Sequence, residues 1–294
     1  MTKKPLSPDT NLFRFRGGAF DLSSRTHVVG ILNVTPDSFS DGGRFADPDS
    51  ALRHAEKMAG EGADIIDVGG ESTRPFSEPV DESTETRRVV PVISAIARRF
   101  DIPVSVDTCK ASVAAAAVDA GARIINDISA LRFDSRMGEV AARLKTGVIL
   151  MHMKGTPRNM QENPEYADVM SEIRVFLSAA VKRARSHGIE FERIMLDPGI
   201  GFGKKLEHNL TILRNLSDLA DLRRPILVGP SRKSFIGLLT NRPVDERLSG
   251  TLAAVVGSVL NGASAVRVHD VGQAREAATV ADAILRGVKP GARA

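Results

Sequence analysis

The sequence is poor in cysteine, since Cys109 is the only one among 294 residues. A single cysteine excludes an intrachain disulfide, and the chain has no paired CxxC that could hold a structural zinc ion. No stretch is long enough without charge to span a bilayer, and the first residues lack the apolar core of a signal peptide. We therefore expect a cytoplasmic protein that is not embedded in a membrane.

Aromatic side chains are also scarce, at 4% of the chain, with no tryptophan and one tyrosine. Basic residues are spread along the sequence, and the net charge of +4 contains no block of like charges. A nucleic-acid-binding surface usually combines clustered basic residues with aromatic residues that stack on bases. We therefore expect no nucleic-acid partner. The mild positive charge suits small anionic ligands, although solvated helix faces explain it equally well.

Signatures of hydrolytic enzymes are missing as well. The chain has no GxSxG elbow and no HExxH motif, and Cys109 has no obvious base beside it. The stretch GIGFGKK at 199–205 is similar to a phosphate-binding P-loop, but that motif requires Ser or Thr where this chain has Lys205. We interpret 199–205 as a flexible loop, on which Phe202 either covers an aromatic ligand or packs beneath the loop.

The chain does contain a series of short apolar, β-branched runs, each bounded by Gly, Pro or Asp. Continuous runs of this length are typical of strands buried on both faces of a parallel sheet. Segments with helical spacing lie between them, for example 49–61, 82–100, 112–120, 168–187 and 248–261. About eight such strand–helix units predict an α/β fold of the (β/α)8 TIM-barrel type. The predicted strands are residues 27–33, 64–69, 103–107, 123–127, 147–152, 193–197, 225–229 and 265–269.

A β-hairpin is expected ahead of the barrel, because 13–16 and 19–22 alternate in polarity on either side of Gly17 and Gly18. We expect this hairpin, at about residues 12–24, to cap the bottom of a barrel that spans 26–288. No low-complexity linker interrupts the chain, so we expect one domain over residues 1–294.

Polar residues close nearly every predicted strand, which is where a TIM barrel carries its chemistry. A single aspartate in such a place is about as often a helix cap as a site residue, but caps do not easily explain so many polar residues together. We expect His152 to be packed rather than to contact a ligand. The polar residues at the ends of the predicted strands are Asn33, Glu71, Ser72, Thr73, Arg74, Asp107, Asn126, Asp127, His152, Asp197, Ser231, Arg232, Lys233, Arg267 and His269.

Asp107, Asn126, Asp197 and Lys233 bring carboxylates, an amide and a cation to one barrel mouth. A planar heterocycle with a 2-amino-4-oxo-pyrimidine edge would match this set, because its adjacent N–H donors suit a carboxylate and its carbonyl suits a lysine. Guanine and pterin both have this edge.

An anion site is predicted beside it. Arg267 and His269 alternate along the last strand, which neighbours the first strand and Asn33 in a closed barrel. Two cations beside an amide indicate a phosphorylated or diphosphorylated group, and Asn33 with Asp37 and Asp41 could help to hold Mg²⁺. Turn chemistry explains Asp37 and Asp41 at least as well.

Eight stretches, in order along most of the chain, resemble the motifs of one family. GILNVTPDSFSDGG at 30–43 and GADIIDVGGESTRP at 62–75 are followed by VSVDT, INDIS, LMHMKGTP, DPGIGFGK, GPSRKSFIG and VRVHDV. Together they resemble the dihydropteroate synthases, folate-pathway enzymes built on a pterin-binding TIM barrel. One departure is Phe76, which stands where that family commonly has glycine; a bulky residue there could alter how the second loop closes.

The resemblance implies that 6-hydroxymethyl-7,8-dihydropterin diphosphate condenses with 4-aminobenzoate to give 7,8-dihydropteroate and diphosphate. It further implies Mg²⁺ as cofactor, a homodimer, and closure of loops one and two over the substrates. Because no side chain is a plausible covalent nucleophile, we expect a dissociative, SN1-like step. The implied catalytic residues are Asp107, Asp197, Lys233 and Arg267. The residues implied to bind the pterin are Asp107, Asn126, Asp197, Lys233 and Arg267. Those implied to bind the diphosphate are Asn33, Thr73, Arg267 and His269, and Asn33 is also the implied metal ligand. Those implied to bind 4-aminobenzoate are Phe202, Phe39, Arg74 and Ser231.

Two other classes remain open at this stage. A methyltetrahydrofolate-binding methyltransferase would share the barrel and the pterin-holding acids, and a non-catalytic pterin-binding protein would share the pterin pocket. Neither has a diphosphate to bind, so the anion-site residues Asn33, Arg74, Arg267 and His269 favour the synthase.

Overall fold

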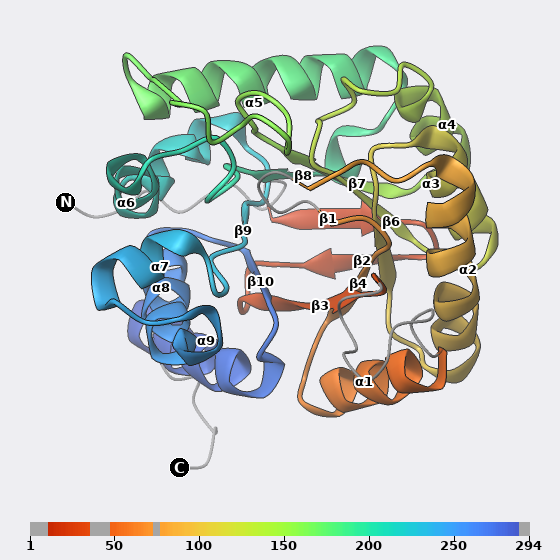
Figure 1. The fold of residues 1–294 in the computed structure, drawn as a ribbon, viewed down its shortest axis with the longest axis horizontal. Coiled ribbons are helices and arrows are strands. Elements are labelled where there is room, and N and C mark those ends of the chain that lie inside the picture. The colour runs from red at the N-terminus through yellow and green to blue at the C-terminus, as the bar shows by residue number, and fades with distance from the viewer. Residues whose placement is uncertain (1–10, 36–47, 73–76, 288–294) are drawn as a thin grey trace.

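A computed structural model describes residues 11–35, 48–72 and 77–287, and shows a parallel β-barrel surrounded by helices (Figure 1). The eight barrel strands pair in the order β8-β7-β6-β5-β4-β3-β10-β9, and a parallel bridge between Leu196 and Ile226 closes the ring. All eight overlap the predicted runs, so the predicted TIM barrel is confirmed. The strands are β3 (His27–Asn33), β4 (Ile65–Gly69), β5 (Val104–Asp107), β6 (Ile124–Asp127), β7 (Gly147–Met151), β8 (Ile194–Asp197), β9 (Leu227–Val228) and β10 (Ala265–Val268).

The helices cover the outside of the barrel with their apolar faces. Side-chain caps define two of the long helices, since Asp81 accepts from the Thr84 N–H and Asp168 accepts from the Ser171 N–H. The α-helices are α1 (Pro48–Gly60), α2 (Glu82–Arg99), α3 (Ala111–Asp119), α4 (Met137–Leu144), α5 (Val169–Ser186), α6 (Leu206–Arg214), α7 (Ser234–Thr240), α8 (Leu248–Leu260) and α9 (Val271–Arg286). Short 3-10 turns are η3 (Phe191–Arg193), η4 (Leu216–Leu222) and η5 (Val244–Glu246).

An antiparallel hairpin of β1 (Leu12–Phe15) and β2 (Gly18–Asp21) precedes the barrel, as predicted. Its turn is one residue earlier than expected, because Gly18 already pairs with Phe15 and only Gly17, at φ +76°, adopts the left-handed conformation. Phe13 and Phe15 pack in one buried cluster with side chains from seven barrel strands, among them Ile124. The hairpin therefore fills the end of the barrel at which the strands begin.

The strand register aligns the polar strand ends across the opposite end of the barrel. Asn33 pairs in register with Gly69, Gly69 with Asp107, and Asp107 with Asn126. A Cβ atom on Gly69 would lie 3.5 Å from Asn33 Oδ1 and 3.6 Å from Asp107 Cβ, which is van der Waals contact, so both polar side chains lie directly beside this position. The barrel mouth thus carries an ordered row of polar groups. Within the described ranges, no helix is long and apolar enough to cross a membrane.

Candidate active site

Arg267 on β10 is the centre of a charged cluster at the barrel mouth. Its Nε atom lies 2.6 Å from Asp67 Oδ2, and its Nη2 atom lies 2.8 Å from Asp107 Oδ2. The guanidinium is thus held by carboxylates from two neighbouring strands, β4 and β5, and its plane is fixed by two charge-assisted hydrogen bonds. The side chain retains 19% of its exposure, so it is fixed yet still accessible from the mouth.

Asp67 is a site residue that the sequence analysis missed. It is fully buried, and its Oδ2 atom also accepts a hydrogen bond of 3.0 Å from the Asn126 amide, so it orients two of the predicted residues. Its Oδ1 atom is buried without a hydrogen-bond partner. The signal was present, because a carboxylate in the middle of the apolar strand β4 needs a polar partner inside the barrel.

The two predicted acids, Asp107 and Asp197, have perturbed acidities. Burial raises the pKa of Asp107 to about 7, an effect that Arg267 opposes and that the neighbouring carboxylate of Asp67 reinforces. Burial also raises the pKa of Asp197 to about 6, against a hydrogen bond from the Gly199 N–H and the charges of Lys233, Lys204 and Arg267. Strongly perturbed carboxyl groups that converge on one mouth are typical of active sites.

Lys233 lies at the start of α7, where it forms the N-cap, and faces the loop after β8. Its Nζ atom lies 4.1 Å from the centre of the Phe202 ring, which is a cation–π contact. Burial, together with the charge of Arg267, lowers the pKa of Lys233 to about 8. Lys233, Phe202 and Asp197 therefore form a second group at the mouth, on the side of β8 and β9.

The loop 199–204, predicted to be flexible, is held by hydrogen bonds to side chains outside it. Its backbone N–H and C=O groups are bonded to the side chains of Gln161, Tyr166 and Asn209. Gly199 shows why glycine is required, since its φ is +70° and a Cβ atom would lie 2.0 Å from the His152 carbonyl oxygen. Phe202 is 9% exposed and packs with Met151, Met153 and Met160, so most of its ring lies beneath the loop.

Ser231 and His269 form a pair at the end of β10. Ser231 Oγ accepts a hydrogen bond from the His269 N–H at 3.2 Å and lies 2.9 Å from His269 Nδ1. The hydroxyl and the ring nitrogen are within hydrogen-bonding distance and share one hydrogen atom between them. Burial lowers the pKa of His269 to about 3, with Arg267 and Arg232 contributing. His269 is therefore a neutral imidazole here rather than the cation expected from the sequence.

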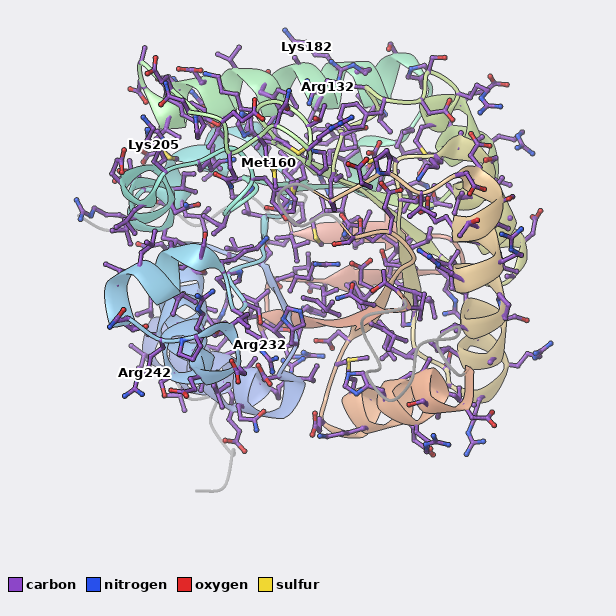
Figure 2. All side chains as sticks on the ribbon, viewed as in Figure 1. Arg132, Met160, Lys182, Lys205, Arg232 and Arg242 are labelled. Carbon is purple, nitrogen blue, oxygen red and sulfur yellow. The ribbon has the colours of Figure 1, made fainter. Side chains whose placement is uncertain are left out.

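Several predicted polar strand ends have structural partners instead of a place in the cluster. Asp127 accepts from the Ser129 and Leu131 N–H groups, and Arg232, labelled in Figure 2, is ion-paired with Asp270. Glu71 is paired with Lys110, which also contacts buried Glu85. His152 is 4% exposed and stacks edge-on against Phe176, so the prediction that it is packed is confirmed.

A cavity of about 610 Å³ adjoins the cluster over the ends of β5 to β7. Asp107 belongs to both the cavity and the cluster, and Lys110, Phe133 and Arg158 are among the other lining residues. Cys109 also lines this cavity, and burial raises the pKa of its thiol well above the usual value, so the thiol remains protonated. The acid at the centre of the site is therefore reachable by a small molecule.

Other predicted residues lie outside the described ranges: Thr73, Arg74 and Phe76 of loop two, and Asp37, Phe39 and Asp41 of loop one. Asn33 is described and ends β3 at the mouth, partly exposed. Within 11–35, 48–72 and 77–287, no group of three or more His, Cys, Asp or Glu residues could hold a metal ion. One amide oxygen at Asn33 still fits Mg²⁺ bound largely through substrate phosphates, since this ion commonly takes few protein ligands.

Comparison with known proteins identifies the class to which this barrel and cluster belong. Residues 29–269 match the family model described as pterin binding enzyme. The dihydropteroate synthase of Synechocystis sp. is 48% identical over 268 residues, which is 91% of this chain and 93% of the relative. The chain therefore belongs to the pterin-binding enzyme family.

Solved structures narrow the class further. The Yersinia pestis dihydropteroate synthase, solved with a sulfonamide drug complex, is 47% identical with a TM-score of 0.88, covering 93% of this chain and 98% of that one. The Xanthomonas albilineans dihydropteroate synthase, solved with 4-aminobenzoic acid, is 42% identical with a TM-score of 0.88, covering 94% and 98%. Within its family the chain is a dihydropteroate synthase, a transferase of folate synthesis.

Proposed function

We propose that this site condenses 6-hydroxymethyl-7,8-dihydropterin diphosphate with 4-aminobenzoate, giving 7,8-dihydropteroate and diphosphate. The observation that carries the proposal is the convergence of Arg267 with Asp67 and Asp107 at a mouth to which buried Asp197 and Lys233 also contribute. A neutral pterin with a charged tail needs both a set of acceptors for its N–H edge and a cation for its tail, and this mouth provides both.

For the pterin, we propose that Asp197 accepts the N–H groups of the 2-amino-4-oxo edge and that Lys233 donates to the carbonyl. Asp107 and Asn126 would bond the remaining ring nitrogen atoms, and Arg267 would lie against the ring. Support comes from the burial of both acids, because a hydrogen bond to a buried carboxylate is stronger than one in water. Asp67 would hold Arg267 and Asn126 in position through its 2.6 Å and 3.0 Å contacts.

For the diphosphate, we propose a site made by Asn33, Thr73, Arg267 and His269. A neutral His269 ring that carries its hydrogen on Nε2 would donate to a phosphate oxygen while Arg267 supplies the positive charge. Mg²⁺, held by Asn33 and the diphosphate oxygens, would neutralise the charge of the leaving group.

For 4-aminobenzoate, we propose a place between Phe202 and loop two with Arg74, its carboxylate near Ser231 and the start of α7. Because the hydroxyl of Ser231 is engaged by His269, a Ser231→Ala change should weaken diphosphate binding as well as aminobenzoate binding. Ser234, the exposed first residue of α7, is the matched comparison. If Ser234→Ala raises the KM for aminobenzoate and Ser231→Ala does not, the carboxylate is held at Ser234 instead.

The reaction itself is proposed to be dissociative. The C–O bond to diphosphate breaks first, and the exocyclic carbon is left as a cation that conjugation with the electron-rich pterin ring stabilises. The amine of aminobenzoate then attacks with its free lone pair and loses a proton to water, so no strong general base is needed.

Positional isotope exchange tests this order of events. With oxygen-18 in the bridging position and benzoate in place of aminobenzoate, a dissociative step scrambles the label into the non-bridging positions of the recovered substrate. Retention of the label under conditions in which aminobenzoate is turned over would point to direct displacement. A second check is binding order, since diphosphate should strengthen pterin binding and aminobenzoate should bind only afterwards.

We further propose that the protein acts in the cytoplasm as a homodimer of single-domain subunits. Apolar side chains are exposed along α7, η5 and α9, and a second copy could cover them. They are Leu238, Leu239, Val244, Val280, Ile284 and Leu285. Sedimentation of the protein tests this, because a monomer at micromolar concentration would contradict it.

A further inference from the structure

Lys204 is a buried lysine whose role neither the cluster nor the proposed substrates explain. It is 3% exposed, and it follows Phe202 and Gly203 in the loop after β8. Its Nζ atom lies 3.0 Å from His152 Nδ1, and it donates to the Phe202 carbonyl at 2.9 Å and to the His152 carbonyl at 3.4 Å. All three acceptors are uncharged. A buried ammonium without a carboxylate in direct contact lowers stability, so its charge needs an explanation.

The anion that responds to this charge is Asp197, which is 6% exposed at the end of β8. Lys204 and Asp197 attract each other electrostatically, although the hydrogen bonds of Lys204 to the described residues go to His152 and Phe202. One oxygen of Asp197 accepts the Gly199 N–H at 2.6 Å. Since the hydrogens of Lys204 are directed to His152 and Phe202, the lysine supplies positive charge without occupying the oxygens of the carboxylate.

The same ammonium fixes the aromatic wall of the site. Its hydrogen bond to the Phe202 carbonyl joins the loop to the end of β7 through His152, and the Phe202 ring in turn contacts Lys233. One buried cation of this loop thus holds the backbone of Phe202 and acts on the carboxylate of Asp197.

We propose that Lys204 is a positioning residue of the pterin site, whose charge keeps Asp197 an acceptor for the pterin N–H edge and whose hydrogen bonds hold Phe202 in place. The inference rests on the proposed role of Asp197 in binding the pterin. Lys204 does not touch the substrates; it acts through these two residues.

The charges that face each group fix the direction of the effect. Lys233, Lys204 and Arg267 all lower the pKa of Asp197, which burial raises to about 6. Lys204 itself faces Asp197 and Lys233, and burial lowers its pKa to about 7. Removal of the Lys204 charge therefore raises the pKa of Asp197 further.

His152 does not add a competing titration. Burial and the charges of Lys204, Arg132 and Lys154 lower its pKa to about 2, so it stays neutral across the range in which Asp197 ionises. A neutral imidazole that accepts at Nδ1 carries its hydrogen on Nε2.

The test separates charge from hydrogen bonding with two variants, Lys204→Gln and Lys204→Met. Gln keeps amide hydrogens for His152 and Phe202 but has no charge, whereas Met keeps neither. The matched control is Lys205→Gln, which removes the same charge one residue later at the partly exposed N-cap of α6 (Figure 2). Each protein is titrated with 6-hydroxymethylpterin from about pH 5 to about pH 8, and the KM for aminobenzoate is measured alongside.

In Lys204→Gln the acid limb of pterin binding should move up by about one pH unit, which is about tenfold weaker binding below the midpoint. Binding near pH 8 should change less than twofold, and Lys205→Gln should match the wild type. Lys204→Met should show the same shift of the acid limb and, because it also loses the hydrogen bonds to Phe202 and His152, a higher KM for aminobenzoate. Lys204→Arg, which restores the charge, should return the limb toward the wild-type position and keeps the test open if the neutral variants fold poorly.

An acid limb that coincides in Lys204→Gln, Lys205→Gln and the wild type would overturn the inference. Uniformly weaker binding at every pH would do so too, because it would mean that Lys204 only stabilises the loop. Wild-type protein that binds no pterin at all would instead contradict the proposed function, so the two failures can be told apart.

Discussion

Asp67→Asn is the change that examines the cluster most sharply, because Asp67 acts only through its neighbours. The substitution keeps the shape but removes the anion that lies 2.6 Å from Arg267 Nε. Arg267 retains Asp107 as a partner at 2.8 Å, so the loss is that of one hydrogen bond between charged groups, about 1.5–3 kcal/mol. This is smaller than the stability of about 5–15 kcal/mol that is usual for a domain, so the variant should fold.

If the contact orients Arg267 for the substrate, the same free energy is lost from the transition state. We expect kcat/KM for the pterin diphosphate to fall about 10- to 150-fold, since about 1.4 kcal/mol corresponds to a factor of ten. The pKa of Asp107 should also fall from about 7, because the negative charge of Asp67 helps to raise it, so the acid limb of kcat/KM moves to lower pH.

The control for this variant is Asp64→Asn at the opposite end of the barrel. The Asp64 side chain is only 8% exposed and is paired with Arg25 and Arg275, but it lies where β4 is about to begin. Urea denaturation should show a loss of stability in both variants, whereas steady-state kinetics should change only in Asp67→Asn. Equal kinetics in the two variants would refute the positioning role of Asp67.

Three further predictions concern the loop, the histidine and the hairpin. Gly199→Ala should lower stability by more than the about 1–3 kcal/mol that backbone strain alone costs, because the new Cβ atom would lie 2.0 Å from the His152 carbonyl oxygen. Thermal denaturation should show a lower midpoint for this variant. Gly257→Ala is the control and should not lower the midpoint, since its new Cβ atom would meet nothing within 4 Å outside its own helix backbone. His269→Asn should lose less stability than the wild type when the pH is lowered. The pKa of His269 is lowered to about 3 in the fold, so its contribution to stability is present above the usual pKa of about 6.5 and is lost as the pH falls from there towards 3. Denaturation of both proteins at several pH values checks this. Phe13→Ala should lower the free energy of unfolding by about 3–5 kcal/mol, because the ring of Phe13 is fully buried between the hairpin and the barrel. The midpoint of urea denaturation should fall, while kcat per folded molecule stays unchanged.

The barrel could be predicted from the sequence because each buried strand appears as a continuous apolar run. The run 27–33 is identical to β3, and the others differ from their strands by one to three residues. The polar strand ends were predictable for the same reason, since parallel strands bring their carboxyl ends to one edge. Asp107, Asn126 and Arg267 do meet there.

Other features depend on contacts between distant parts of the chain, which no local pattern encodes. Asp67 was not predicted because it lies in the middle of β4, whereas the polar residues that mark a barrel mouth stand at the strand ends. The loop around Phe202 has the glycines of a flexible segment, yet Tyr166, about forty residues away, bonds its backbone. The charge of His269 was misjudged because burial, which lowers its pKa, is a property of the folded chain.

The central claim is tested most directly by the products of the reaction. The wild-type protein is incubated with the dihydropterin diphosphate, Mg²⁺ and 4-aminobenzoate, and dihydropteroate and diphosphate are quantified together. The account predicts equal amounts of the two products, with no dihydropteroate when 4-aminobenzoate is left out. Pterin binding by a well-folded protein without any turnover would contradict it.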